Sequence, residues 1–283
     1  KKVIKECKDE KKFKMLQNSV KEIEVLLKID HPCICKAIGY NMEEEITEIN
    51  KKHDSESDED FDEEEEEKEE AKTTIALFFE LLPYTVKDVI DKGMMNNTLK
   101  VRIAIEVAYG MSHIHSLRMI HRDLKLENIM MNNIFESKII DFGLVRVDEL
   151  IGDQSTLTKG VGTLAYMSPE MVSEEDYDNK TDVYSYGIVL YVLFVGRLPK
   201  QSMKEKLDKV QIKFPKPSSK ISQYCIELIK KCTSFEPSKR PSFDEIIDDL
   251  NQNSFNLASE VDTDLINLRY QFLNNLKEQH HYW

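Results

Sequence analysis

Residues 184–195 form the feature that most constrains the fold, because this stretch (Tyr-Ser-Tyr-Gly-Ile-Val-Leu-Tyr-Val-Leu-Phe-Val) is almost entirely apolar. A bilayer-spanning helix needs about 20 such residues, so the run is too short to cross a membrane. A helix that is hydrophobic on all sides has to be buried by other elements. The run therefore predicts a central helix enclosed within a mainly helical domain.

The sequence from residue 98 onward supports that domain, since its apolar residues recur at helical spacing. Leu99, Ile103, Val107 and Ile114 mark one face of a first helix. Further helices are predicted near 221–233 and 242–251. Residues 252–283 continue with some periodicity, carried by Leu265, Leu268 and Phe272.

The N-terminal part has a different pattern. Apolar residues at helical steps predict a helix over residues 13–27, and His31-Pro32 ends it. Residues 33–40 suit a strand, and residues 75–82 (Ile-Ala-Leu-Phe-Phe-Glu-Leu-Leu) are predicted to be a fully buried strand. Strands and one helix followed by helices predict an α+β fold, with a small lobe joined to a larger α lobe.

A strongly acidic segment, residues 43–72, separates the two predicted strands. Residues 43–70 carry 17 Asp and Glu against 3 Lys, whereas the whole chain of 283 residues has a formal net charge of −13. The rest of the chain is thus nearly neutral, and the low pI belongs to this segment alone. Such a self-repelling, low-complexity run predicts a disordered insertion between neighbouring strands of one sheet.

Two interpretations of the insertion remain open: a solvated loop without function, or a contact site for a basic partner. Ser55 and Ser57 stand among acidic residues, a setting that suits acidophilic kinases. No nucleic-acid partner and no membrane partner are expected, and no signal peptide is visible. The five cysteines are scattered without zinc-ligand spacing, which indicates reduced thiols in a cytoplasmic protein.

Two polar motifs carry the chemistry. His121-Arg122-Asp123-Leu124-Lys125-Leu126-Glu127-Asn128 is followed by Asp141-Phe142-Gly143, and then by Gly162-Thr163 and Ser168-Pro169-Glu170. In composition, order and spacing the chain resembles the eukaryotic protein kinase family. The resemblance covers roughly residues 3–250. It implies a two-lobed kinase fold whose N-lobe is β-rich, contains one helix and lacks its first strands.

The resemblance also implies a role for individual residues. Asp123 would orient the attacking hydroxyl, Lys125 would stabilise the transferred phosphoryl group, and Asn128 and Asp141 would hold Mg²⁺ as hard oxygen ligands. Lys5, in Val3-Ile4-Lys5, would hold the phosphates of ATP, with Glu22 as its partner.

An adenine site follows from the same likeness. Phe79 would be the gatekeeper, the Glu80 carbonyl and the Leu82 N–H would bind the adenine edge, and Val3 and Met130 would pack on either side of the ring. The implied cofactors are ATP and Mg²⁺.

One family feature is missing, because no Gly-x-Gly-x-x-Gly occurs in the chain. Either the first strands lie outside this sequence or the loop is lost. The expected function is accordingly an ATP-dependent protein kinase, with a pseudokinase or scaffold as the alternative. Lys125 resembles the serine/threonine pattern, so the expected substrate is a protein with a Ser or Thr acceptor.

Regulatory and structural roles are implied as well. Arg122 would pair with a phosphate on the activation loop, for which Ser155, Thr156 and Thr158 are the candidate acceptors, whereas Thr163 is expected to be structural. Arg240 is expected to pair with Glu170, and His113 and His115 are expected to be structural histidines. The expected organisation is a partial N-lobe over 1–82 containing the insert 43–72, a C-lobe over 83–251 and a helical extension or tail over 252–283. The oligomeric state is left open.

Overall fold

The computed structural model describes residues 23–48, 69–141, 146–147, 164–215 and 221–279. The chain divides into two compact units, a smaller one of residues 1–28 and 36–80 and a larger one of residues 29–35 and 81–283. The smaller unit is rich in strand and the larger one is mainly helical, so the predicted α+β fold is confirmed. None of the helices in the described ranges is both long and apolar enough to cross a membrane.

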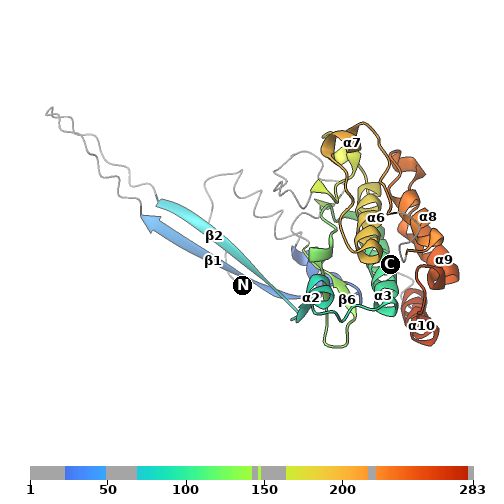
Figure 1. Cartoon of the computed structure of the whole chain (residues 1–283). Helices are drawn as coiled ribbons and strands as arrows, with labels where there is room; N and C mark the ends of the chain where they lie inside the picture. The colour runs from blue at the N-terminus through green and yellow to red at the C-terminus, as the bar shows by residue number, and fades with distance from the viewer. Residues whose placement is uncertain (1–22, 49–68, 142–145, 148–163, 216–220, 280–283) are drawn as a thin grey trace, which may run out of the picture. The chain divides into compact units, whose positions relative to one another are not determined.

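The smaller unit contains a long antiparallel hairpin, β1 (Ala37–Glu48) and β2 (Glu69–Phe79) (Figure 1). The strands therefore take in residues 43–48 and 69–72, which the acidic pattern had assigned to a disordered insert. The register pairs Glu45 with Lys72 and Glu44 with Thr73, so the backbone pairing of the apolar part of the hairpin continues into the acidic segment. Residues 49–68 lie outside the described part.

The strand predicted over residues 75–82 differs from the structure in length and in burial. β2 ends at Phe79, and Phe78 is 53% exposed. Within the described residues β2 pairs only with β1, and Leu77 and Phe79 of the apolar run are also exposed, at 36% and 38%. The strand predicted over residues 33–40 likewise begins only at Ala37, preceded by a single bridge between Ile34 and Ile139.

The larger unit is organised around α6 (Lys180–Val195), whose side chains are buried on every face. The prediction of a central buried helix is thereby confirmed. Gly187 permits close packing against α8, because a Cβ there would lie 2.6 Å from the Thr233 side chain. Gly196 ends the helix with φ 84°, a left-handed conformation that glycine adopts without steric cost.

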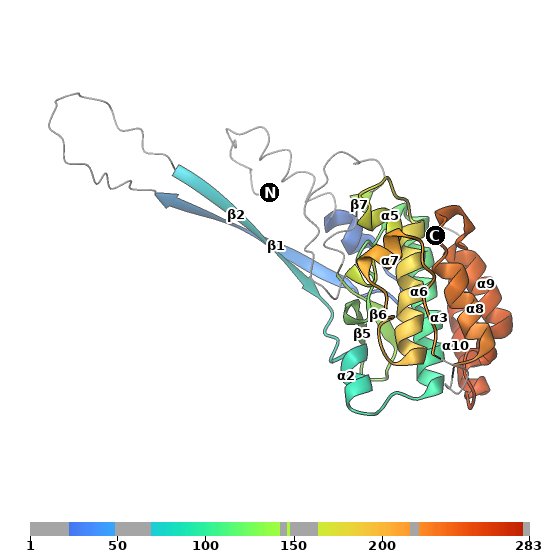
Figure 2. The same ribbon diagram turned by 45° about the horizontal axis from the view of Figure 1, so that its top comes forward.

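Helices α3 (Asn97–Ser116), α8 (Gln223–Cys232) and α9 (Phe243–Asn253) confirm the helices expected from residue periodicity. α8 packs on α6, and α9 packs on α3 (Figure 2). A further helix, α10 (Thr263–Gln279), also packs on α3.

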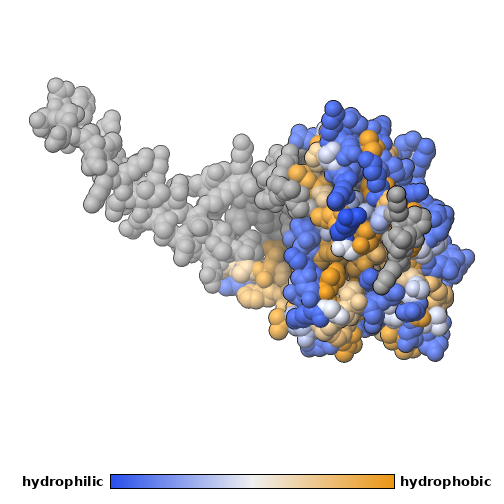
Figure 3. All heavy atoms as spheres, viewed as in Figure 1, coloured by the Kyte–Doolittle hydropathy of each residue, from blue (hydrophilic) through white to orange (hydrophobic). Residues whose placement is uncertain are grey.

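The periodicity noted in the sequence of this region did not identify the buried face of α10. Leu268 is 64% exposed, while Ile266, Tyr270 and Leu273 are buried. Apolar residues occur around much of this helix, and its packing against α3 selects one side. On the face drawn in Figure 3, hydrophobic and hydrophilic patches of the larger unit alternate.

The remaining elements of the larger unit are short. The helices are α2 (Val86–Asp91), α5 (Pro169–Val172) and α7 (Met203–Leu207), with 3-10 turns η1 (Leu126–Asn128), η3 (Pro237–Lys239) and η4 (Ser254–Asn256). The strands form two small sheets, β3-β5-β6 and β4-β7, from β3 (Tyr84–Thr85), β4 (Met119–Ile120), β5 (Ile129–Met131), β6 (Ser137–Ile139) and β7 (Arg146–Val147). These strands position the loop that carries the polar motifs.

Candidate active site

The centre of the site is the loop between β4 and β5, which holds Asp123. Its Oδ2 accepts hydrogen bonds from Lys125 Nζ at 2.5 Å and from Asn128 Nδ2 at 3.0 Å. Asn128 Nδ2 also donates to the Asp123 carbonyl at 2.8 Å. The structure thus brings together Asp123, Lys125 and Asn128, three of the residues that the motif singles out.

The second carboxylate oxygen of Asp123 has a different environment. Oδ1 is buried and makes no hydrogen bond to any described residue. A buried acceptor without a partner is uncommon, because it forfeits the hydrogen bond that it would make with water. Asp123 therefore has one oxygen held by Lys125 and Asn128 and one that makes no hydrogen bond within the described part of the chain.

A buried carboxylate, Asp182 at the start of α6, holds the backbone of this loop from beneath. It accepts from the N–H of His121 at 2.9 Å, from the N–H of Arg122 at 2.8 Å and from His115 Nε2 at 2.9 Å. Burial by itself would raise the pKa of Asp182, but the hydrogen bonds from His115 and from the His121 backbone keep that pKa below its ordinary value. The structural role expected of His115 is consistent with this contact.

His121 links the loop to the strand that leads to Asp141. Its Nδ1 accepts from the Asp123 N–H at 3.3 Å, so Nε2 is the donor to the Ile140 carbonyl at 3.0 Å. The Ile140 N–H in turn donates to the Asn128 carbonyl at 2.9 Å. Asp141, the next residue, is thereby tied through its neighbour to both ends of the loop.

Asn128 and Asp141 have the chemistry that a magnesium ion requires. The Asn128 NH₂ group is used by Asp123, which leaves its Oδ1 for a cation, and Asp141 is an exposed carboxylate. Mg²⁺ is held in many nucleotide sites by one or two such oxygens together with phosphates and water. Among the described residues no group of three or more His, Cys, Asp or Glu could hold a metal ion.

The other predicted residues divide between the two units. Leu82 is buried and Met130 half-buried in the larger unit, whereas Phe79 is 38% exposed in the smaller unit. Glu80, in the smaller unit, accepts from the Lys36 N–H through Oε1 at 2.8 Å. Residues Val3, Lys5, Glu22, Ser155, Thr156, Thr158 and Thr163 lie outside the described residues, so their assigned roles stay predictions.

The ion pair expected between Arg240 and Glu170 is confirmed. Two parallel hydrogen bonds join the guanidinium to the carboxylate at 2.5 and 2.8 Å, and Arg240 is almost fully buried. Burial alone would raise the pKa of Glu170, but the guanidinium holds that pKa below its ordinary value. This pair fixes the end of the segment that follows the two motifs.

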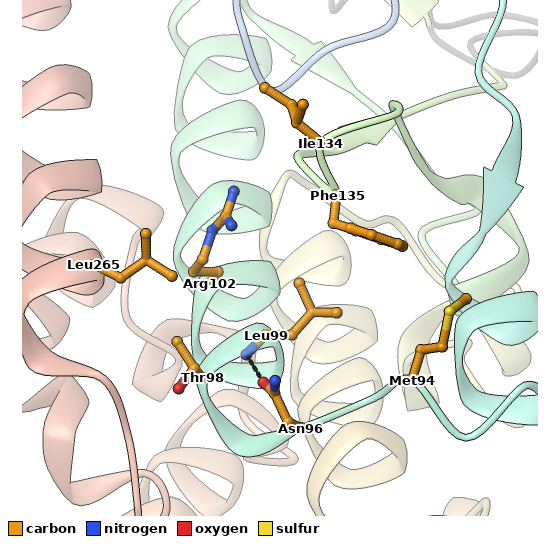
Figure 4. A pocket seen from close by; sticks show the side chains of 8 residues that line it. All are labelled: Met94, Asn96, Thr98, Leu99, Arg102, Ile134, Phe135 and Leu265. Carbon is orange, nitrogen blue, oxygen red and sulfur yellow. Dashed lines mark hydrogen bonds between the residues drawn. The ribbon is translucent and has the colours of Figure 1, made fainter.

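A separate hollow of about 270 Å³ lies between the start of α3, the turn joining β5 to β6, and α10 (Figure 4). The Asn96 side chain caps α3 beside it by accepting from the Leu99 N–H at 2.8 Å. Its lining contains none of the residues that the motifs single out. It consists of Met94, Asn96, Thr98, Leu99, Arg102, Ile134, Phe135 and Leu265.

Comparison with known proteins gives a family match that spans most of the chain, since residues 1–250 match the protein kinase domain. A probable serine/threonine-protein kinase of Dictyostelium discoideum is 30% identical over 84% of this chain and 16% of its own length. The serine/threonine-protein kinase STY17 of Arabidopsis thaliana is 35% identical over 57% of this chain and 28% of its own length. The serine/threonine/tyrosine-protein kinase HT1 of the same plant is 39% identical over 52% of this chain and 38% of its own length. The chain therefore spans less than half the length of each of these relatives.

Proposed function

The chain belongs to the protein kinase family, and from this premise we propose that it transfers the γ-phosphoryl group of ATP to a serine or threonine hydroxyl of a protein. The observation that carries the proposal is the state of Asp123. One of its oxygens is held by Lys125 and Asn128, and the other is buried without a partner among the described residues. A substrate hydroxyl would donate to that second oxygen and so be oriented for attack.

The neighbouring residues would complete the reaction. Lys125, whose ammonium lies beside Asp123, would move towards the transferred phosphoryl group and stabilise its charge. Asn128 and Asp141 would hold Mg²⁺, which when bound would neutralise charge on the phosphate groups. Two of the relatives are named serine/threonine-protein kinases, which supports serine or threonine as the acceptor. HT1 is named a serine/threonine/tyrosine-protein kinase, so tyrosine is an alternative acceptor that the assay should measure.

ATP would be held by the remaining members of the predicted set. Lys5, paired with Glu22, would bind its phosphates. The adenine ring would lie between Val3 and Met130, with Phe79 behind it and the backbone of Glu80 and Leu82 at its edge. A cytoplasmic location belongs to the same proposal, because ATP and reduced thiols are available there.

The acidic segment supports a second, smaller proposal about partners. Residues 49–68 carry 11 acidic and 3 basic side chains between the two strands of a hairpin. A protein surface or substrate rich in Lys and Arg is the partner that such a segment would attract.

The direct test is phosphate transfer in the presence of Mg·ATP, measured by mass spectrometry on the chain itself and on a peptide library. Asp123→Asn keeps the size of the side chain but removes the charged acceptor, so the transfer rate should fall by about 10²- to 10⁴-fold. Glu127→Gln, an exposed carboxylate in the same loop, is the matched control and should leave the rate unchanged.

Three results would contradict the proposal in different ways. Equal rates for the wild type and Asp123→Asn would exclude the assigned role of Asp123. Binding of Mg·ATP without any transfer would favour the pseudokinase alternative. Phosphotyrosine as the sole product would overturn the assignment of the acceptor.

A further inference from the structure

A buried lysine at the edge of the larger unit is not explained by any of the motifs. Lys206 lies on α7 and is 3% exposed, although Lys204 on the same helix is exposed. The Lys206 ammonium donates to the carbonyls of Leu164 at 3.1 Å, Ala165 at 3.1 Å and Met167 at 2.7 Å. Three donors thus meet three acceptors within one short backbone segment.

The helix that carries Lys206 has a firmly held N-terminus. The Ser202 hydroxyl accepts from the Glu205 N–H at 3.2 Å, and the Glu205 carboxylate accepts from the Ser202 N–H at 2.9 Å. This reciprocal capping box fixes the first turn of α7. The position of Lys206 is thereby set by α7 as well as by the carbonyls that it binds.

Burying this ammonium costs free energy that the surroundings only partly return. Among the described residues no carboxylate forms an ion pair with Lys206, and burial lowers its pKa to about 8, with the Glu170 charge opposing the shift. The Tyr184 ring lies 5.2 Å from the ammonium and also 5.2 Å from the Arg240 guanidinium. An apolar side chain in this place would leave three backbone carbonyls without this donor, so the role of the lysine is to hold the segment that it binds.

What it binds is the segment directly before Ser168-Pro169-Glu170. Ser185 Oγ donates to the Tyr166 carbonyl at 2.9 Å within this segment, and Ser168 Oγ is bonded to Thr181 Oγ1 at 2.7 Å just after it. The Tyr166 hydroxyl lies near the backbone of Leu126, the residue that begins the 3-10 turn ending at Asn128. Residues 164–167 therefore connect Lys206 to the loop that holds Asp123.

We propose that Lys206 is a positioning residue for the protein substrate, because it holds residues 164–167 as a fixed wall beside the Asp123 loop. The inference rests on the proposed kinase function and deepens it. Lys206 does not touch ATP or the reacting atoms. Its loss should therefore weaken the use of the protein substrate and leave the use of ATP intact.

The kinetic test compares Lys206→Met with Lys204→Met, the exposed lysine of the same helix. Lys206→Met should lower kcat/KM for an acceptor peptide by about tenfold, since three charge-assisted hydrogen bonds are lost, while KM for Mg·ATP changes by less than about twofold. Lys204→Met should match the wild type, and Lys206→Arg should recover part of the peptide kcat/KM. A wild-type value for Lys206→Met, or an equal loss towards ATP and peptide, would overturn the proposal.

A second measurement does not depend on catalysis. Hydrogen exchange followed by mass spectrometry should be at least about tenfold faster over residues 164–168 in Lys206→Met than in Lys204→Met. An unchanged exchange rate over these residues would refute the proposal that Lys206 holds them in place, even if the chain transfers no phosphate. If the proposed kinase function is wrong, the wild type will transfer no phosphate, but the difference in hydrogen exchange between Lys206→Met and Lys204→Met will still be observed.

If Lys206→Met does not fold, the wild type and Lys206→Arg provide the same test through pH. The groups that act on the Lys206 ammonium are the Glu170 charge from α5, the Tyr184 ring from α6 and the three carbonyls of residues 164, 165 and 167. The peptide KM of the wild type should rise as pH passes about 8, because the ammonium loses its proton, whereas Lys206→Arg stays charged and should show no such rise. Identical pH profiles for the two proteins would refute the proposal.

Discussion

At the residue scale, two positions of the candidate site have backbone conformations that L-residues rarely adopt. Arg122 has φ 70° and Asp141 has φ 67°. Each left-handed residue of this kind costs about 1–3 kcal/mol and persists only where the surroundings hold it. Here Asp182 binds the Arg122 N–H, and the hydrogen bonds of Ile140 hold the residue before Asp141. Stored strain of this kind is typical of functional sites.

A pair of buried histidines provides a residue-scale prediction about stability. His31 and His113 stack with ring centroids 5.1 Å apart. Burial lowers the pKa of His113 from 6.5 to about 4, and burial together with the charge of His113 lowers that of His31 to about 3. Between pH 6.5 and about 4 the unfolded chain binds protons that the folded chain does not. The free energy of unfolding should therefore fall with falling pH by about 1.4 kcal/mol per pH unit for each histidine.

His113→Phe keeps an aromatic ring but cannot titrate. As the pH falls, its free energy of unfolding should therefore decrease by about 1.4 kcal/mol per pH unit less than that of the wild type. The measurement is urea unfolding at pH 7, 6 and 5 for both proteins. Slopes that are equal for the wild type and His113→Phe would contradict the assignment of acid sensitivity to this pair.

At the element scale, α10 is attached to the rest of the larger unit by a buried ion network. Arg269 is on α10, and its Nε lies 2.7 Å from Oε1 of Glu106 on α3. Its Nη1 lies 2.7 Å from Oε1 of Glu136, in the turn before β6. Glu106 is fully buried, and its Oε2 also accepts from the Ser137 N–H at 2.7 Å. The network thus joins the C-terminal helix to the strand that leads to Asp141.

Arg269→Met should leave the Glu106 carboxylate buried without its ion pair to Arg269. The expected loss is about 3–5 kcal/mol in the free energy of unfolding, as for other broken buried pairs. Lys277→Met is the matched control on the same helix, since the ion pair between Lys277 and Asp244 is exposed and should contribute less than about 1 kcal/mol. Denaturant unfolding measures both, and a similar small loss for the two variants would contradict a structural role for the network.

At the scale of the whole molecule, one segment dominates the charge. Residues 49–68 contribute −8 to the formal net charge of −13, and they connect Glu48 to Glu69, which face each other across the hairpin. Long loops between paired strands add little closure entropy, so such a segment can vary without loss of the fold. Its effect should therefore be on partners and not on stability.

Replacing residues 49–68 with Asn-Gly, a two-residue hairpin turn, should leave the free energy of unfolding within about 1 kcal/mol of the wild type. Binding to a polylysine-coated surface at low salt should instead be strongly reduced, because −8 of the formal net charge of −13 is removed. A variant with the same 20 positions scrambled in order is the control and should still bind. Undiminished binding by the Asn-Gly variant would contradict the proposed basic partner.

The sequence by itself identified the polar motifs and most helices of this protein. Asp123, Asn128 and Asp141 stand in a motif whose order and spacing are local, and the apolar run of α6 can be stable only when it is buried. The tertiary structure alone decided which face of α10 turns inward, how far β1 and β2 extend into the acidic segment, and that Lys206 is buried. Lys206 and Leu164 are 42 positions apart, and Glu106 and Ser137 are 31 apart. Periodicity reports on neighbours within a few residues, whereas burial and ion pairing depend on contacts that only the folded chain creates.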